Sequence, residues 1–79
     1  MAGVANAYPA GASDGRPGIR IRLAYDADRV DALKRAVPHT EREWDEVALE
    51  WWVAAAYERL LRRMFPNIAA FLDQPRLPL

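Results

Sequence analysis

The segment TEREWDEVALEWWVAAAYERLLRRMF, residues 40–65, decides the fold because it supports two incompatible secondary structures. In the first, Thr40 and Glu43 form a capping box, and one long helix carries an apolar stripe along one side. The stripe would hold Trp44, Val47, Ala48, Trp51 and Ala55. Leu49 and Val53 contradict this arrangement, because on a helical wheel they fall among charged residues on the opposite side.

In the second structure the same residues form a β-hairpin, with Trp44 on the first strand and a turn across residues 45–48. Alternation in the second strand then directs Leu49, Trp51 and Val53 inward and Glu50 and Trp52 outward. The hairpin sorts apolar from charged residues better than the helix does. Neither glycine nor proline marks its turn, so periodicity alone leaves both alternatives open.

The residues before this segment predict a strand followed at once by a helix. From Ile19 to Tyr25, large apolar residues alternate with Arg20, Arg22 and Ala24, the period expected of a strand with one buried face. Asp26 then suits a helix N-cap. Apolar residues recur at helical spacing as far as Val37, where Pro38 ends the helix.

The two ends of the chain show different patterns. Residues 1–18 hold all four glycines and no apolar periodicity, and we expect a flexible leader there. Apolar residues from Tyr57 to Phe65 recur at helical spacing and predict an amphipathic helix, followed by a shorter helical piece up to Leu72. We therefore expect one folded domain over residues 19–72 and a C-terminal tail over 73–79.

Scattered positions along this domain form a second pattern: Tyr25-Asp26, Val30, Leu33, Lys34, Val37-Pro38, Arg42, Trp44-Asp45, Trp51, Val53 and Tyr57. This pattern resembles the HARP domain and its small stand-alone prokaryotic and phage-type relatives. The resemblance implies a β-α-β-β-α fold and favours the hairpin. We expect an α+β domain whose three-stranded sheet has helices packed on one face. HARP domains accompany ATPase motors that rewind DNA, and they help to engage single-stranded and junction DNA.

Composition argues against catalysis and against metal or cofactor binding. The 79 residues contain no cysteine, and His39, Ser13 and Thr40 are each the only residue of their type, so no catalytic triad can form. One histidine without cysteine cannot make a typical transition-metal site. The lack of cysteine fits the reducing cytoplasm, and no apolar run is long enough to cross a membrane. We expect a non-enzymatic cytoplasmic protein without a cofactor.

An Arg/Trp face of the sheet is the candidate binding site. Trp52 must point away from the side of the sheet that Trp44 and Trp51 would bury in the core. We expect Trp52 to lie among Arg20, Arg22 and Arg42, where it could stack a base while the arginines bind phosphates. A secondary basic patch is expected on the last helix, at Arg59, Arg62 and Arg63.

Two functions fit these observations. The first is an accessory module that binds single-stranded or junction DNA without a motor, because the phosphate-binding loop of ATPases is missing. The second is a protein-interaction module, either a homodimer or a small regulator of a larger enzyme. The net charge of zero is the sum of basic residues 19–39, acidic residues 40–58 and basic residues 59–79. The acidic block departs from the family, whose members carry basic residues around this hairpin.

Overall fold

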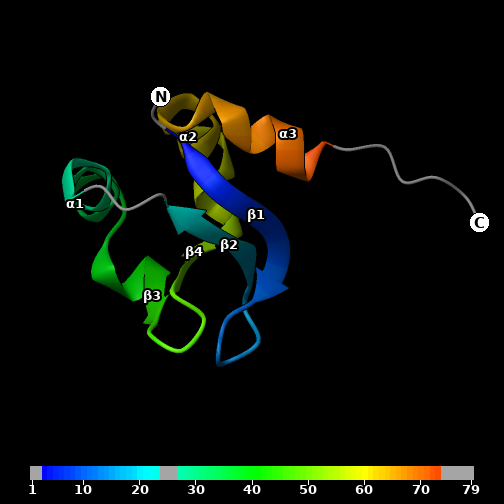
Figure 1. Cartoon of the computed structure of the whole chain (residues 1–79). Coiled ribbons are helices and arrows are strands. Elements are labelled where there is room, and N and C mark those ends of the chain that lie inside the picture. Colours follow the sequence, from blue (N-terminus) through cyan, green and yellow to red (C-terminus); the bar gives the residue numbers. More distant parts are fainter. Residues whose placement is uncertain (1–2, 24–26, 74–79) are drawn as a thin grey trace, which may run out of the picture.

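The computed structural model describes residues 3–23 and 27–73, which form a four-stranded antiparallel sheet with helices (Figure 1). The strands are β1 (Val4–Gly11), β2 (Pro17–Leu23), β3 (Arg42–Asp45) and β4 (Glu50–Ala54), in the spatial order β1-β2-β4-β3. The α-helices are α1 (Ala27–Ala36), α2 (Glu58–Met64) and α3 (Ala69–Leu72), with 3-10 turns at His39–Glu41, Ala55–Tyr57 and Pro66–Ile68. The predicted α+β class is confirmed, but the sheet has four strands and not three.

The additional strand is β1, so the prediction of a flexible leader over residues 1–18 is wrong for this part of the chain. β1 pairs antiparallel with β2, and its Val4 and Ala7 side chains are buried. The pairing register shifts between Val4 and Asn6, which breaks the alternation by which a strand is recognised. Pro9 is tolerated because β1 lies at the edge of the sheet. Pairing with β2, more than local sequence preference, makes this segment a strand.

The hairpin alternative for residues 40–65 is confirmed, since β3 and β4 pair antiparallel and no single helix runs through the segment. The turn between them works without glycine. Leu49 adopts a left-handed backbone with φ of 58°. One carboxylate oxygen of Asp45 accepts hydrogen bonds from the backbone N–H groups of Val47 at 3.0 Å and Ala48 at 2.9 Å. The Asp45 side chain therefore stabilises a turn that contains no residue typical of turns in its tip.

All helices pack on one side of the sheet, which we call the helix face. The strand register places Ile21 opposite Trp51 and Ile19 opposite Val53 on this face. The buried core there contains Val4, Ala7, Ile19, Ile21, Leu33, Val37, Trp51, Val53, Leu61, Phe65 and Ile68. Figure 1 shows α1 on one side of the molecule and α2 with α3 on the other. The helices thus cover the helix face in two groups.

The C-terminal helices follow the prediction closely. The expected helix from Tyr57 to Phe65 is α2, and the shorter piece is the 3-10 turn at Pro66–Ile68 with α3. Asn67 joins this region to β1, because its side chain accepts a hydrogen bond from the N–H of Val4 at 2.9 Å and donates one to the Val4 carbonyl at 2.8 Å. The predicted cap at Asp26 and the tail beyond residue 73 lie outside the described residues.

Candidate binding groove

On the side of the sheet opposite the helices, charged side chains pair with one another. We call this side the ionic face. Arg20 lies 2.8 Å from an Asp45 carboxylate oxygen and 3.2 Å from Glu50, and the Tyr8 hydroxyl donates to Glu50 at 2.6 Å. This hydrogen bond to Glu50 raises the pKa of Tyr8. Hydrogen bonds from the Ala48 backbone and from Arg20 lower the pKa of Asp45. Arg20 is therefore compensated by acids and does not present the free cation that a phosphate site needs.

Trp52 belongs to the ionic face, as alternation predicts, but it is not exposed there. Its side chain is only 1% exposed, and its indole N–H donates to the carbonyl of Ala10 at 3.0 Å. The guanidinium of Arg16 lies 5.0 Å from the ring centroid, and the backbone of Gly18 lies directly against the indole. The prediction that Trp52 is available for base stacking is wrong, because the β1–β2 hairpin covers it.

The structure also separates the three arginines that were expected around Trp52. Arg42 lies on the other side of the sheet, where its Nε donates to the carbonyl of Val37 at 3.0 Å. Arg22 lies near the end of β2, donates to the carbonyl of Ala48 at 3.0 Å and is 3.9 Å from Glu50. Only Arg20 remains beside Trp52, so the predicted Arg/Trp face is not formed by these four residues.

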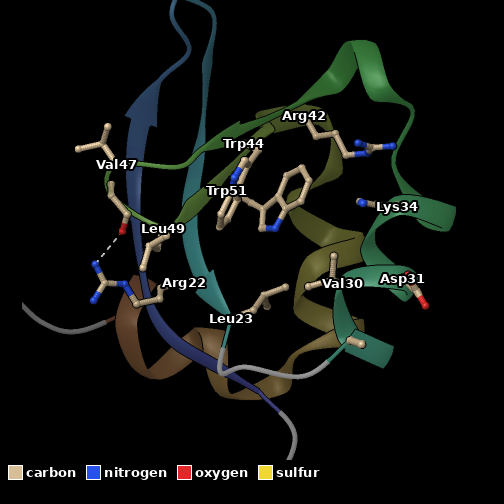
Figure 2. A pocket seen from close by; sticks show the side chains of 12 residues that line it. Arg22, Leu23, Val30, Asp31, Lys34, Arg42, Trp44, Val47, Leu49 and Trp51 are labelled. Atoms are coloured by element: carbon tan, nitrogen blue, oxygen red, sulfur yellow. Dashed lines mark hydrogen bonds between the residues drawn. The ribbon is translucent and has the colours of Figure 1, made fainter.

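A groove on the helix face brings together a different set of aromatic and basic side chains. It lies between α1 and the β3–β4 turn and encloses about 1010 Å³ (Figure 2). We call it the tryptophan groove. Its lining consists of Arg22, Leu23, Ala27, Val30, Asp31, Lys34, Arg42, Trp44, Val47, Ala48, Leu49 and Trp51. Figure 2 shows Lys34 and Arg42 on the α1 side, Arg22 and Leu49 on the other side, and the indole of Trp51 between them.

Two tryptophans form the aromatic part of this groove. Trp44 and Trp51 pair across β3 and β4, with ring centroids 5.2 Å apart and ring planes inclined at 47°. Trp51 is 8% exposed, which agrees with its predicted core position, whereas Trp44 is 49% exposed. The prediction that Trp44 is buried in the core is wrong, because β3 is an edge strand whose end the helices leave uncovered. Trp44 is thus the aromatic residue available to a ligand.

Two cations lie above Trp51 and face the groove. The ammonium of Lys34 is 5.8 Å from the Trp51 ring centroid, and the guanidinium carbon of Arg42 is 5.6 Å from it. Among residues 3–23 and 27–73, neither cation forms an ion pair, in contrast to Arg16, Arg20 and Arg62. A cation over an indole gains attraction from the ring but keeps its charge. The groove therefore offers two cations that have no ion pair in the described part of the chain, beside an exposed aromatic ring, with Asp31 as its one lining acid.

The secondary basic patch on α2 is partly used for internal contacts. Arg62 pairs with Glu58 at 3.0 Å and with Asp73 at 2.7 Å, and the Arg62 guanidinium lowers the pKa of Asp73. Arg59 and Arg63 are exposed. None of the three lines the tryptophan groove.

The residue pattern does not identify Lys34 and Leu49 as groove residues. Lys34 matches only the family resemblance, and alternation along the second strand of the hairpin predicts an inward side chain for Leu49. The available signal was the spacing of Val30 and Lys34, which are four residues apart and therefore share one side of α1. That spacing could have placed an apolar residue and a cation together, but not opposite Trp44.

The described residues contain no group of three or more His, Cys, Asp or Glu side chains that could hold a metal ion. His39 is exposed at the start of a 3-10 turn. Among the same residues no helix is long and apolar enough to cross a membrane.

Comparisons with known proteins identify no relative: no family model, no curated protein and no solved structure matches this chain.

Proposed function

We propose that this chain is a non-enzymatic accessory module that binds single-stranded DNA in the tryptophan groove. The observation that carries the proposal is the half-exposed Trp44 beside Trp51, flanked by Lys34 and Arg42, which have no acidic partner among the described residues. Proteins bind unpaired strands by stacking bases on aromatic side chains while cations track the phosphates. The groove combines both features within one site.

The acidic residues of the hairpin do not oppose this function, because internal contacts use most of them. Glu41 pairs with Arg16 at 3.0 Å, and Glu43 accepts hydrogen bonds from Ser13 at 3.0 and 3.1 Å. Asp45 and Glu50 belong to the ionic face, on the side of the sheet away from the groove. These acids replace the basic residues of HARP relatives without adding free negative charge to the groove.

The resemblance to HARP domains remains part of the proposal. From Pro17 to Met64 the order of elements is strand, helix, strand, strand, helix, which agrees with the order that the resemblance implies. Family members help to engage single-stranded and junction DNA, and a junction offers the unpaired bases that the groove suits. We propose that the module acts in the cytoplasm, where a chain without cysteine loses nothing to the reducing conditions.

Fluorescence anisotropy with a labelled single-stranded oligonucleotide at low salt tests the proposal. We expect Trp44→Ala to weaken binding about tenfold, because one stacked base contributes about 1–3 kcal/mol. Lys34→Ala should also weaken binding and reduce the slope of log K against log salt by about 0.7, as expected for the loss of one phosphate contact.

Arg63→Ala is the matched control, because it removes an exposed cation of α2 that does not line the groove. It should leave the affinity nearly unchanged. The proposal fails if no saturable binding occurs at about 20 mM salt, where electrostatic attraction is strongest. It also fails if Arg63→Ala weakens binding as much as Lys34→Ala.

A protein-interaction function is the second candidate, and one observation favours it. Val47 is 94% exposed and Leu49 is 60% exposed at the rim of the groove. Aliphatic side chains gain little from a phosphate backbone but are well suited to an apolar partner surface.

A further inference from the structure

Several large apolar side chains are exposed to solvent next to one another at the β3–β4 turn. Among the described residues, the exposed large hydrophobics are Tyr8, Trp44, Val47 and Leu49, and all except Tyr8 border the same turn. Single exposed apolar residues are normal on protein surfaces, whereas a contiguous group typically marks an interaction site. We refer to residues 46–49 as the turn tip.

The turn tip also contains a residue, Leu49, with an unfavourable backbone conformation. Leu49 has a φ of 58°, a conformation that costs a residue with a Cβ about 1–2 kcal/mol and that glycine or asparagine adopts more easily. The Leu49 side chain is 60% exposed, so burial within its own chain does not offset this cost. Strained backbone conformations cluster at ligand-binding and switch sites, so Leu49 is a candidate contact residue.

The turn tip is also held in a defined shape. The Asp45 carboxylate accepts from two of its N–H groups, and Arg22 donates to the Ala48 carbonyl at 3.0 Å. A surface that is ordered before binding loses little conformational entropy when a partner docks.

From these observations we infer that a second copy of this chain docks its turn tip in the tryptophan groove. Charge complementarity identifies the occupant. The tip carries Glu46, which has no ion pair among the described residues, next to Val47 and Leu49. The groove offers Lys34 and Arg42, which form no ion pair among the described residues, beside a largely apolar lining. Its other charged residues are Arg22 and Asp31, so the cations outnumber the acids. One chain thus carries both an acidic apolar tip and a basic apolar groove.

A dimer with twofold symmetry would form this tip–groove contact twice, once in each copy's groove. In a symmetric dimer the same patch is used on each copy, so each tip meets the partner's groove. Because the tip borders its own groove, one patch contains both complementary parts. The second copy and a single DNA strand would then occupy the same groove, so self-association would regulate access to the proposed nucleic-acid site.

Sedimentation velocity of the full chain without nucleic acid tests this inference. We expect a monomer–dimer equilibrium between about 10 and 500 μM, the range of a weak interface. Val47→Asp should weaken the dimer at least about tenfold, as expected for a central apolar contact. Ala32→Asp makes a comparable change at an exposed position of α1 outside the groove and should leave the dimer intact.

Leu49→Gly separates association from folding. Glycine suits the positive φ, so thermal unfolding should occur at the same or a higher temperature, while the dimer is weakened. A monomer throughout the concentration range overturns the inference, as does a dimer that both tip variants retain. Since no DNA is present, a dimer without DNA binding contradicts only the proposed function, and DNA binding by a strict monomer contradicts only this inference.

Discussion

Trp52 and Trp44 have different roles although both are tryptophans of the same hairpin. Trp52 is buried on the ionic face beneath the β1–β2 hairpin, where its N–H donates to the Ala10 carbonyl and so satisfies the one polar atom of the side chain. Burial of an indole contributes several kcal/mol to stability, at about 25 cal/mol per Å² of apolar surface. Trp44 leaves half of its surface in solvent. We therefore assign stability to Trp52 and ligand binding to Trp44.

Gly18 permits the burial of Trp52. A Cβ at this position would meet the Trp52 indole and the Val53 carbonyl oxygen. We expect Gly18→Ala to lower the free energy of unfolding by about 1–3 kcal/mol in urea denaturation, because the packed indole must move. Gly11→Ala is the matched control, since its nearest neighbouring atom would lie 3.8 Å away, an ordinary contact. Equal effects of the two substitutions would contradict the packing described for Trp52.

The orientation of the tryptophans could be predicted from the sequence, but their exposure could not. Alternation correctly places Trp51 and Trp52 on opposite sides of β4. It does not reveal which side another segment covers. Trp52 is covered because β1, which has no apolar period, folds back along β2, and Trp44 is uncovered because β3 is at the edge. Exposure depends on contacts between distant segments, and local pattern does not contain that information.

At the scale of elements, the β3–β4 hairpin links the ionic face to the tryptophan groove. Asp45 accepts hydrogen bonds from the turn with one carboxylate oxygen and contacts Arg20 with the other. Ion pairing on one side of the sheet thereby supports the shape of the turn that borders the groove on the other side.

Asp45 predicts a pH dependence of stability. Its pKa is lowered in the folded protein, so its contribution is fully present above the unfolded value of about 3.9 and is lost as the pH falls through the folded pKa. We expect the free energy of unfolding to decline below about pH 4 more steeply in the native protein than in Asp45→Asn. Urea denaturation at a series of pH values measures the difference.

Asp45→Asn is informative because the amide oxygen can still accept from the turn while the charge is lost. Among the described residues, the other carboxyls with lowered pKa are Asp14 and Asp73, which are unchanged in both proteins and cancel in the comparison. Identical slopes below pH 4 would show that neither the N–H groups of the turn nor Arg20 stabilise the Asp45 carboxylate in solution.

Some helices and strands could be predicted from the sequence, and others could not. β2, α1 and α2 show clear periods, and a sheet of these elements follows from them. The hairpin could be preferred but not proved, because its turn depends on one aspartate side chain and a leucine at positive φ. β1 is not predicted by its sequence. Its sequence of small residues with a register shift has no local preference strong enough to identify a strand.

At the scale of the whole molecule, the two ends of the described chain depend on one another. Asn67 makes two hydrogen bonds to the backbone of Val4 across a separation of 63 residues. We expect Asn67→Ala to lower the free energy of unfolding by about 2 kcal/mol, because two backbone groups lose their partner. Asn6→Ala serves as control, since the Asn6 side chain accepts only from the N–H of the next residue. A larger effect at Asn6 than at Asn67 would contradict this link.

Charge is also organised at the scale of the molecule. Eleven basic and eleven acidic residues give a net charge of zero, which by itself predicts no preference for a charged partner. In the structure, Arg20 forms ion pairs with acids of the ionic face, and Arg16 forms one beside the β1–β2 hairpin. Lys34 and Arg42 form no ion pair among the described residues. Neutrality of the whole chain is therefore compatible with one positively charged groove.

An amide and indole NMR titration with a single-stranded oligonucleotide at about 20 mM salt and constant protein concentration shows whether DNA binds in the tryptophan groove. We predict saturable shifts at Lys34 and Arg42 and at the indole N–H of Trp44, with the Tyr8 and Arg20 amides unchanged. Shifts confined to the ionic face, or none at saturating oligonucleotide, would contradict binding in the groove.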